Sequence, residues 1–225
     1  MPNEKPLVTV DSVLFTYADQ EIQVLLVKRA LAPEIDKWAL PGGIVDTDAD
    51  EDLERTALRK LQEKTGVAPR YLDQLETRGS QSRDPRGWSI TVVYTALIAK
   101  QDCQSHISSV ADAQWVSLDN VSSMTLAFDH NELITSAAER LKQRALYSIA
   151  PGYALADKFT LSELQHLHEL LIGKPLQKRS FRRRIDQAGL LIDTGKKRRE
   201  HGRPATLYKL KEKSRNYTFL RNLES

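Results

Sequence analysis

The chain has very little cysteine, and this scarcity excludes an internal disulfide framework. Cys103 is the single cysteine among 225 residues. It lies in the polar stretch AKQDCQSHISS, which has none of the partner signatures that accompany a catalytic cysteine. We therefore expect a loop thiol at the surface rather than a nucleophile.

Long apolar runs are also missing. No run approaches the about 18 residues that a membrane-spanning helix needs. The first residues, MPNEKPLVTVDS, do not follow the charged-then-apolar order of a secretion signal. The chain is 40% apolar and 28% charged, an ordinary mixture for a globular protein. We therefore expect a cytoplasmic protein with no membrane partner.

Negative charge is scarce in the last third of the chain. Residues 151–225 contain 17 Lys and Arg against 8 Asp and Glu, a net charge of +9. Residues 1–150 contain 16 against 22, a net charge of −6. This asymmetry predicts two domains, 1–150 and 151–225, with a polyanion as the partner of the basic one. A merely solvated basic surface is the alternative.

The N-terminal part has the pattern of a sheet flanked by helices. LVTVDSVLFTY and IQVLLVKR are apolar, β-branched runs, and the polar ADQE between them favours a hairpin. ITVVYTALIA (90–99) and AQWVSL (113–118) predict further strands. Helical spacing of apolar residues predicts helices over 50–64, which Gly66 ends, and over 131–147. We therefore expect an α+β fold.

The stretch from Gly43 to Val67 resembles the signature of the Nudix family, which runs Gly-x5-Glu-x7-Arg-Glu-aliphatic-x-Glu-Glu-x-Gly-aliphatic. Here seven residues separate Gly43 from Glu51, and seven more lead to Arg59, which KLQEKTGV follows. The upstream LLVKRA and KWALPGG are similar to the family as well. The resemblance implies a Nudix α/β/α sandwich.

Two carboxylates of this signature are missing. Positions 60, 63 and 64 share one helix face, and in active family members that face carries three carboxylates that hold magnesium against a diphosphate. This chain has Lys60, Glu63 and Lys64 there. At an effective dielectric near 20, an ammonium about 4 Å from a divalent ion costs roughly 8 kcal/mol. We therefore expect no metal site, no catalytic residues and no enzyme, although weak residual hydrolysis stays open.

A cationic helix face still attracts a diphosphate, because lysine supplies the charge that the metal would otherwise supply. We expect a Nudix-type ligand to bind without metal and without turnover; an empty, decayed pocket is the alternative. Guanidinium groups and an aromatic ring for a base would complete the site. The expected ligand-binding residues are Arg29, Trp38, Lys60, Glu63, Lys64, Arg83 and Arg86. A core tryptophan and a solvated turn at 82–88 are the competing interpretations. His130 lies either near the pocket or before a helix as a cap or a surface group.

The basic C-terminal part has the outline of a winged helix-turn-helix. TLSELQHLHELL begins with a capping box, QKRSFRRRIDQAG (177–189) predicts a second helix, and LLIDTG and ATLYKL predict strands around a basic loop, 196–204. If Phe181 and Ile185 pack inward, an arginine row faces outward, where it can enter the major groove while the loop forms a wing. The expected DNA-binding residues are Lys178, Arg179, Arg182, Arg183, Lys196, Lys197, Arg198 and Arg203. Nonspecific RNA binding and an acidic protein partner are alternatives.

The two parts together resemble the NrtR family of Nudix-related transcriptional regulators. The most distinctive stretches are RDPRGW, FDHNEL, SFRRRIDQAGLL and HGRPATLYKL. The resemblance implies a homodimeric repressor of NAD biosynthesis or salvage genes. It would bind palindromic double-stranded DNA, need no cofactor, and be released by the effector ADP-ribose or a related NAD metabolite. One alternative is a Nudix hydrolase in which Glu51, Glu54 and Glu63 recruit metal and the basic domain tethers nucleic acid. Another is an RNA-binding adaptor.

Overall fold

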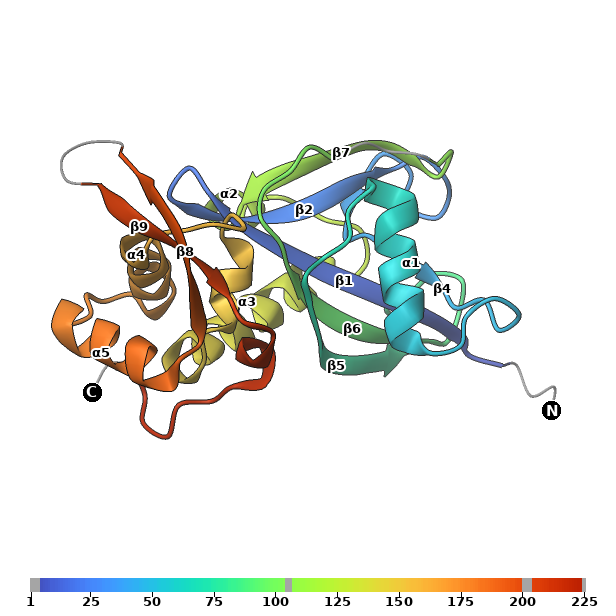
Figure 1. The fold of residues 1–225 in the computed structure, drawn as a ribbon. Coiled ribbons are helices and arrows are strands. Elements are labelled where there is room, and N and C mark those ends of the chain that lie inside the picture. Colours follow the sequence, from blue (N-terminus) through green and yellow to red (C-terminus); the bar gives the residue numbers. More distant parts are fainter. Residues whose placement is uncertain (1–4, 104–106, 200–203, 224–225) are drawn as a thin grey trace. The chain divides into compact units, whose positions relative to one another are not determined.

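The computed structural model describes residues 5–103, 107–199 and 204–223 (Figure 1). The chain forms two compact units. The first comprises residues 1–15, 21–97 and 101–137, and the second comprises 16–20, 98–100 and 138–225. The division falls within helix α3 (His130–Tyr147). The domain boundary expected at residue 150 stays a prediction.

The first unit is built on a seven-stranded sheet in which β3, β2, β1, β6 and β5 lie in that order, while β4 pairs with β1 and β7 with β2. The strands are β1 (Leu7–Ala18), β2 (Glu21–Arg29), β3 (Trp38–Ala39), β4 (Gly42–Ile44), β5 (Tyr71–Ser80), β6 (Ser89–Leu97) and β7 (Val110–Ser117). β1 and β6 are parallel, whereas β1–β4, β2–β3, β2–β7 and β5–β6 are antiparallel. The expected hairpin and the strands predicted over 90–99 and 113–118 are confirmed.

Strand β5 was not predicted from the sequence pattern. Its pairing with β6 shifts register between Gln74 and Glu76. A bulge of this kind breaks the alternation of inward and outward side chains on which strand prediction depends. The structure adds β5 as an edge strand of the sheet.

Helix α1 (Leu53–Thr65) carries the Nudix-like signature and ends where the sequence predicts. The Asp52 side chain accepts a hydrogen bond from the Arg55 backbone N–H at 2.7 Å, and Gly66 closes the helix in the left-handed conformation, with φ of 70°. Ala57 and Leu61 are fully buried, so one face of α1 is anchored in the core. That packing fixes which side chains of α1 remain for the pocket. Helix α2 (Leu118–Val121) is a further short helix of the same unit.

The second unit contains the predicted pair of helices and pair of strands. Its elements are η1 (Ala150–Ala154), α4 (Leu161–Ile172), α5 (Lys178–Ala188), β8 (Leu191–Arg198), β9 (Ala205–Leu210) and η2 (Glu212–Asn216). The expected capping box is present, because Thr160 and Glu163 exchange hydrogen bonds at the start of α4. Phe181 and Ile185 are buried, as expected for the inward face of α5.

The basic loop between the two strands is shorter than the sequence suggested. Strand β8 continues to Arg198, so Lys196 and Lys197 belong to the strand and not to a loop. Lys197 pairs with Thr206 of β9. Backbone hydrogen bonding across the hairpin therefore extends the strand into a stretch that the sequence marks by charge alone. Arg203 lies outside the described residues.

Two further expectations concern the reactivity of Cys103 and the absence of membrane-spanning helices. Cys103 has a free thiol that is half-buried, and burial raises the pKa of this thiol to about 11. The group is therefore protonated and a poor nucleophile at neutral pH. In the parts of the chain that the structure describes, helices with the length and apolar character of a membrane span are absent.

Candidate functional site

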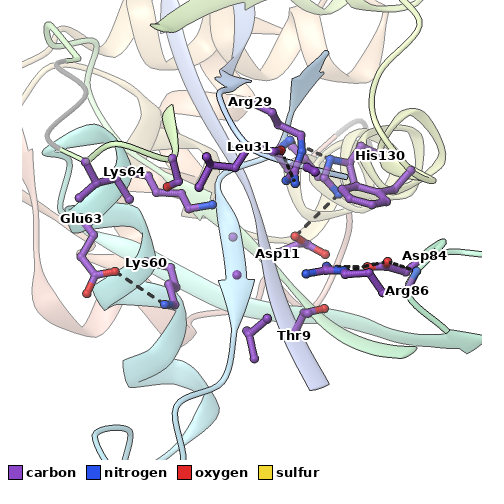
Figure 2. Close-up of a pocket in the computed structure, with 18 of the residues that line it drawn as sticks. Thr9, Asp11, Arg29, Leu31, Lys60, Glu63, Lys64, Asp84, Arg86 and His130 are labelled. Atoms are coloured by element: carbon purple, nitrogen blue, oxygen red, sulfur yellow. Dashed lines mark hydrogen bonds and ion pairs between the residues drawn. The ribbon is translucent and has the colours of Figure 1, made fainter. Parts of the chain in front are cut away.

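A cavity of about 350 Å³ opens in the first unit (Figure 2). Its size is typical of sites for small molecules. Strands β1, β2 and β4, helix α1, the first residue of α3 and the segments at 31–32, 83–86 and 107–109 supply most of its lining. Six of the seven expected ligand-binding residues line it: Arg29, Lys60, Glu63, Lys64, Arg83 and Arg86. The prediction that they bind a ligand remains a prediction.

Trp38 is the expected residue that does not line this cavity. It lies in β3, half-buried, opposite Lys28 of β2. Its backbone carbonyl accepts a hydrogen bond from the Ala127 backbone N–H at 2.8 Å. Trp38 therefore connects the strand to the segment before α3, and its role toward a base stays a prediction.

The face of α1 that borders the cavity is dominated by positive charge. Glu63 accepts a hydrogen bond from the Arg59 guanidinium at 2.8 Å and lies 3.7 Å from the Lys60 ammonium. Arg59 also binds Asp50 at 2.6 Å. The single carboxylate left on this face is therefore already neutralised by two cations.

These residues do not fit a divalent ion. Magnesium needs free carboxylate oxygens, whereas Lys60 and Lys64 occupy two of the three positions and Glu63 is paired. Glu51 and Glu54 do not line the cavity, and Glu51 is paired with Arg55 at 2.6 Å. Within the described residues there is no cluster of three or more His, Cys, Asp or Glu side chains suited to a metal.

Lys64 is the cation of the cavity that most needs a partner. Its enclosure lowers the pKa of its ammonium to about 8. Among the described residues, it has no carboxylate within ion-pairing distance. A largely desolvated charge without a counterion is unfavourable. An anionic ligand in the cavity would provide that counterion.

Arg29 is held at the end of β2 by its surroundings. Its guanidinium donates to the Pro33 carbonyl oxygen at 2.8 Å and lies 5.0 Å from the centre of the Phe128 ring. Burial lowers the pKa of Arg29, and the neighbouring Arg86 adds to this effect. Phe128 has a positive φ of 54°, which is unusual for a residue with a side chain. The backbone at this position therefore directs an aromatic ring to the cavity wall.

The loop before β6 contributes two arginines that are already paired. Arg83 binds Asp129 at 3.0 Å and Asp11 at 3.4 Å. Arg86 binds Asp84 at 2.7 Å. Burial alone would raise the pKa of Asp84, but the hydrogen bonds from Arg86 leave it lowered. These pairs hold the two guanidinium groups in fixed places at the cavity.

Asp11 and His130 are lining residues that sequence reasoning missed or left undecided. Asp11 is buried in the middle of β1, and its Oδ2 accepts a hydrogen bond from the Thr91 hydroxyl at 2.7 Å. The only sequence signal was a carboxylate inside the apolar run VTVDSVLF. His130 is buried at the start of α3, where Nδ1 accepts from the Leu40 backbone N–H at 2.9 Å. It is a wall of the cavity and not a surface group.

The first glycine of KWALPGG has a steric reason. A Cβ at Gly42 would lie 2.3 Å from Asp11 Oδ1 and 2.3 Å from the Val10 carbonyl oxygen. Only glycine therefore lets β4 approach β1 this closely. The approach brings the backbone of β4 to the cavity floor beside Asp11.

The candidate nucleic-acid surface lies in the second unit. Of the expected DNA-binding residues on α5, Lys178, Arg179 and Arg183 are exposed, and Arg182 is half-buried with a nitrogen 3.5 Å from the Ser162 hydroxyl. Lys196 and Lys197 are exposed on β8. Arg198 is paired with Glu163 of α4 at 2.5 Å, so its charge is partly used within the unit. Whether these residues bind DNA stays a prediction.

Comparisons with known proteins match both units. The chain matches two family models, the NrtR DNA-binding winged helix domain over residues 151–210 and the NUDIX domain over residues 5–137. The expected fold class, an α+β Nudix fold followed by a winged helix, is confirmed by these matches and by the solved structures described next.

Three matches, to two relatives, are informative. The ADPR responsive transcriptional repressor NtrR of Acinetobacter baylyi is 40% identical over 219 residues, which are 97% of this chain and 88% of that protein. A crystal structure of Shewanella oneidensis NrtR complexed with a 27mer DNA is 60% identical, with a TM-score of 0.91, and covers 96% of this chain and 99% of that one. The NUDIX domain of Shewanella oneidensis NrtR complexed with ADP ribose is 56% identical, with a TM-score of 0.60, and covers 61% of this chain and 90% of that one.

Proposed function

Because the chain belongs to the NrtR family, we propose that it is a transcriptional repressor whose DNA binding responds to ADP-ribose. The second unit binds DNA and the first unit binds the effector. The genes under its control are those of NAD biosynthesis or salvage. A repressor of this kind works in the cytoplasm.

The proposal that the first unit binds the effector rests mainly on the environment of the Lys64 ammonium in the cavity. Five cationic side chains line the cavity against three carboxylates. Burial lowers the pKa of Lys64 and that of Arg29. In the described part of the chain neither has a carboxylate within ion-pairing distance, and Arg29 is held by the Pro33 carbonyl oxygen. A diphosphate is the ligand that such a surplus of charge favours. ADP-ribose has a diphosphate between two riboses, and the cavity volume suits a molecule of that class.

The DNA half rests on helix α5. Its buried residues Phe181 and Ile185 fix the orientation of the helix, so Arg179 and Arg183 are presented to solvent. Arginine reads guanine edges in the major groove, and lysine at the helix start contacts phosphate. The exposed lysines of β8 add a second basic contact. A homodimer would place two such surfaces on the half-sites of a palindrome.

Effector and DNA compete through linkage. If ADP-ribose binds more tightly to a state with lower affinity for the operator, it loosens DNA binding by the same free energy. Couplings of this kind amount to about 5- to 150-fold in affinity. No metal and no turnover are needed.

The decisive experiment measures DNA binding by fluorescence anisotropy, with a duplex from upstream of the gene's own operon, in EDTA, with and without ADP-ribose. We expect release by ADP-ribose in the wild type and DNA binding without release in Lys64→Gln. Unchanged DNA affinity at saturating ADP-ribose would rule out the effector role. Tighter binding to structured RNA than to the duplex would favour the RNA adaptor.

The hydrolase alternative predicts turnover instead. Excess magnesium, ADP-ribose and a coupled phosphatase would then release phosphate, and Glu63→Gln would abolish that release. We propose that no such turnover occurs, because Glu63 is paired with Arg59 and Lys60. Phosphate release that Glu63→Gln removes would reverse this assignment.

A further inference from the structure

Two facing polar atoms at the cavity have unused hydrogen-bonding capacity. The Oδ1 atom of Asp11 and the Nε2 atom of His130 are 3.7 Å apart, too far for a hydrogen bond. Asp11 and His130 both line the cavity. In Figure 2, His130 approaches Asp11 from one side and Lys64 extends toward it from α1.

The protonation of His130 follows from its contacts. Nδ1 accepts the Leu40 N–H, so in the neutral ring the proton is on Nε2. Burial lowers the pKa of His130, although Asp11 and Asp129 oppose this effect. The imidazole therefore offers an N–H donor toward the space beside Asp11.

Asp11 offers the opposite capability. Its Oδ2 accepts from the Thr91 hydroxyl at 2.7 Å and from Arg83 at 3.4 Å. Among the described residues, Oδ1 receives no hydrogen bond within 3.5 Å. A carboxylate oxygen accepts but cannot donate. The space beside these two atoms thus has a fixed donor on one side and a fixed acceptor on the other.

A hydroxyl group matches this arrangement, because it accepts and donates at once. We propose that Asp11 and His130 together bind a ribose hydroxyl of the effector, and that they exclude nucleotides with a phosphate at that position. The proposal rests on the proposed function, since it assumes that a nucleoside diphosphate sugar enters the cavity. It assigns Asp11 as a specificity-determining residue within a pocket that otherwise attracts phosphate.

Charge explains why such a residue is needed. Lysine and arginine attract any polyphosphate, so the cationic lining does not distinguish ADP-ribose from ATP. A phosphate oxygen accepts the His130 N–H, but it has no proton for Asp11 and brings a negative charge against the carboxylate. Like charges placed together across an interface are strongly unfavourable. Asp11 therefore converts general attraction for phosphate into selection for a sugar.

The test is calorimetric titration of the full chain in EDTA with three ligands. These are ADP-ribose, ATP, which has a phosphate in place of the terminal ribose, and ADP-ribose that carries a 2′-phosphate on its adenosine ribose. We expect the wild type to bind at least one phosphate analogue about tenfold or more weakly than ADP-ribose. Weaker binding of ATP would place the recognised hydroxyl on the terminal ribose. Weaker binding of the 2′-phosphate analogue would place it on the adenosine ribose.

The variant Asp11→Asn provides the sharper readout. Its amide can keep an oxygen toward Thr91 and Arg83 and turn its NH₂ group to the cavity. We expect ADP-ribose to bind about tenfold more weakly and the excluded analogue to bind more tightly than in the wild type. A merely structural role of Asp11 would lower the affinity for all ligands alike. Asp129→Asn is the matched control, because Asp129 also pairs with Arg83 but does not line this cavity; it should keep the wild-type selectivity.

The outcomes distinguish failure of the hydroxyl assignment from failure of the proposed function. If both phosphate analogues bind the wild type as tightly as ADP-ribose, or if Asp11→Asn weakens all three ligands equally, the hydroxyl assignment is wrong and the effector role stands. If the folded wild type does not bind ADP-ribose at all, the proposed function fails as well. Should Asp11→Asn not fold, the wild-type ligand series alone still decides.

Discussion

At the scale of single residues, two ionisable groups have pKa values well below their ordinary ones. Lys64 has an ammonium whose pKa is lowered to about 8, and His168 has an imidazole whose pKa is lowered to about 4. Burial is the largest cause in both. The consequences differ, because Lys64 borders a cavity that a ligand can fill, whereas His168 lies in a closed core.

For Lys64, we predict that ADP-ribose affinity depends on pH above about 8. A bound diphosphate favours the charged amine and raises its pKa, so the complex holds a proton that the free protein loses as pH rises through 8. Affinity should be constant between pH 6.5 and 7.5 and fall by up to about tenfold per pH unit above 8. Titrations from pH 6.5 to 9 measure this.

The control for that experiment is on the same helix face. Lys64→Gln should bind more weakly and lose the pH dependence, whereas Lys60→Gln should bind more weakly and keep it. Equal pH dependence in the wild type and Lys64→Gln would assign the effect to another group.

For His168, we predict a loss of stability in acid. The ring is fully buried against Phe181, with ring centres 5.5 Å apart. Nδ1 donates to the Ala145 carbonyl oxygen at 2.9 Å, and Nε2 has no hydrogen-bond partner in the described part of the chain. Protonation must therefore place a charge on a buried atom without an acceptor.

The direction in which stability changes with pH follows from the lowered pKa of His168. Above about pH 6.5 the ring is neutral in both folded and unfolded chains, so it adds no pH dependence. Between about pH 6.5 and 4 only the unfolded chain gains the proton, which costs the fold up to about 3 kcal/mol. Urea unfolding at several pH values measures the slope. His168→Asn, which can still donate to Ala145, should flatten the slope; the exposed His166→Asn should not.

At the scale of elements, helix α5 concentrates the contacts that the proposed function needs. Arg183 is exposed on it, whereas Arg184 on the same helix donates to the Asn222 carbonyl oxygen. We predict that Arg183→Ala weakens operator binding by about 1–3 kcal/mol without changing the melting temperature. Anisotropy and thermal unfolding measure the two effects.

Arg184→Ala is the matched control on that helix. It should lower the melting temperature, because a contact within the second unit is lost, and should change DNA affinity less than Arg183→Ala. If Arg184→Ala weakens DNA binding more than Arg183→Ala does, the wrong face of α5 has been assigned to DNA.

The elements also show where sequence reasoning succeeds. Helix α1 was predictable because a 3.6-residue period marks its core face and Gly66 marks its end, although the helix begins at Leu53 and not at residue 50. Strand β5 was not, because its bulge hides the two-residue period. The lining contributed by Lys60, Glu63 and Lys64 follows from helical spacing. Asp11, Phe128 and His130 do not, since more than a hundred residues separate Asp11 from the other two and only the folded sheet brings them together.

At the scale of the whole molecule, the charge asymmetry between 1–150 and 151–225 has a measurable consequence. Each phosphate contact releases counterions from DNA, so log affinity falls with log salt concentration with a slope of about −0.9 per contact. Six contacts for a dimer would give a slope of about −5. We predict a slope at least this steep between 50 and 200 mM KCl, measured by anisotropy. A slope near −1 would contradict an extended basic interface.

Linkage adds a reciprocal requirement on the same scale. Whatever factor ADP-ribose imposes on operator affinity, operator DNA must impose on ADP-ribose affinity. Titration of ADP-ribose into the free protein and into the protein–DNA complex compares the two factors. A mismatch would mean that a third state, such as a change in oligomeric form, takes part.

The enclosed ammonium of Lys64, which in the described part of the chain has no carboxylate within ion-pairing distance, also bears on how this protein responds to selection in the laboratory. Groups kept for binding are often unfavourable for the unbound fold, so stability and response oppose each other. Replacement by methionine, of similar length and without charge, should raise the melting temperature while it removes the response to effector. A screen for heat resistance would therefore enrich apolar residues at this position, and the survivors would repress permanently.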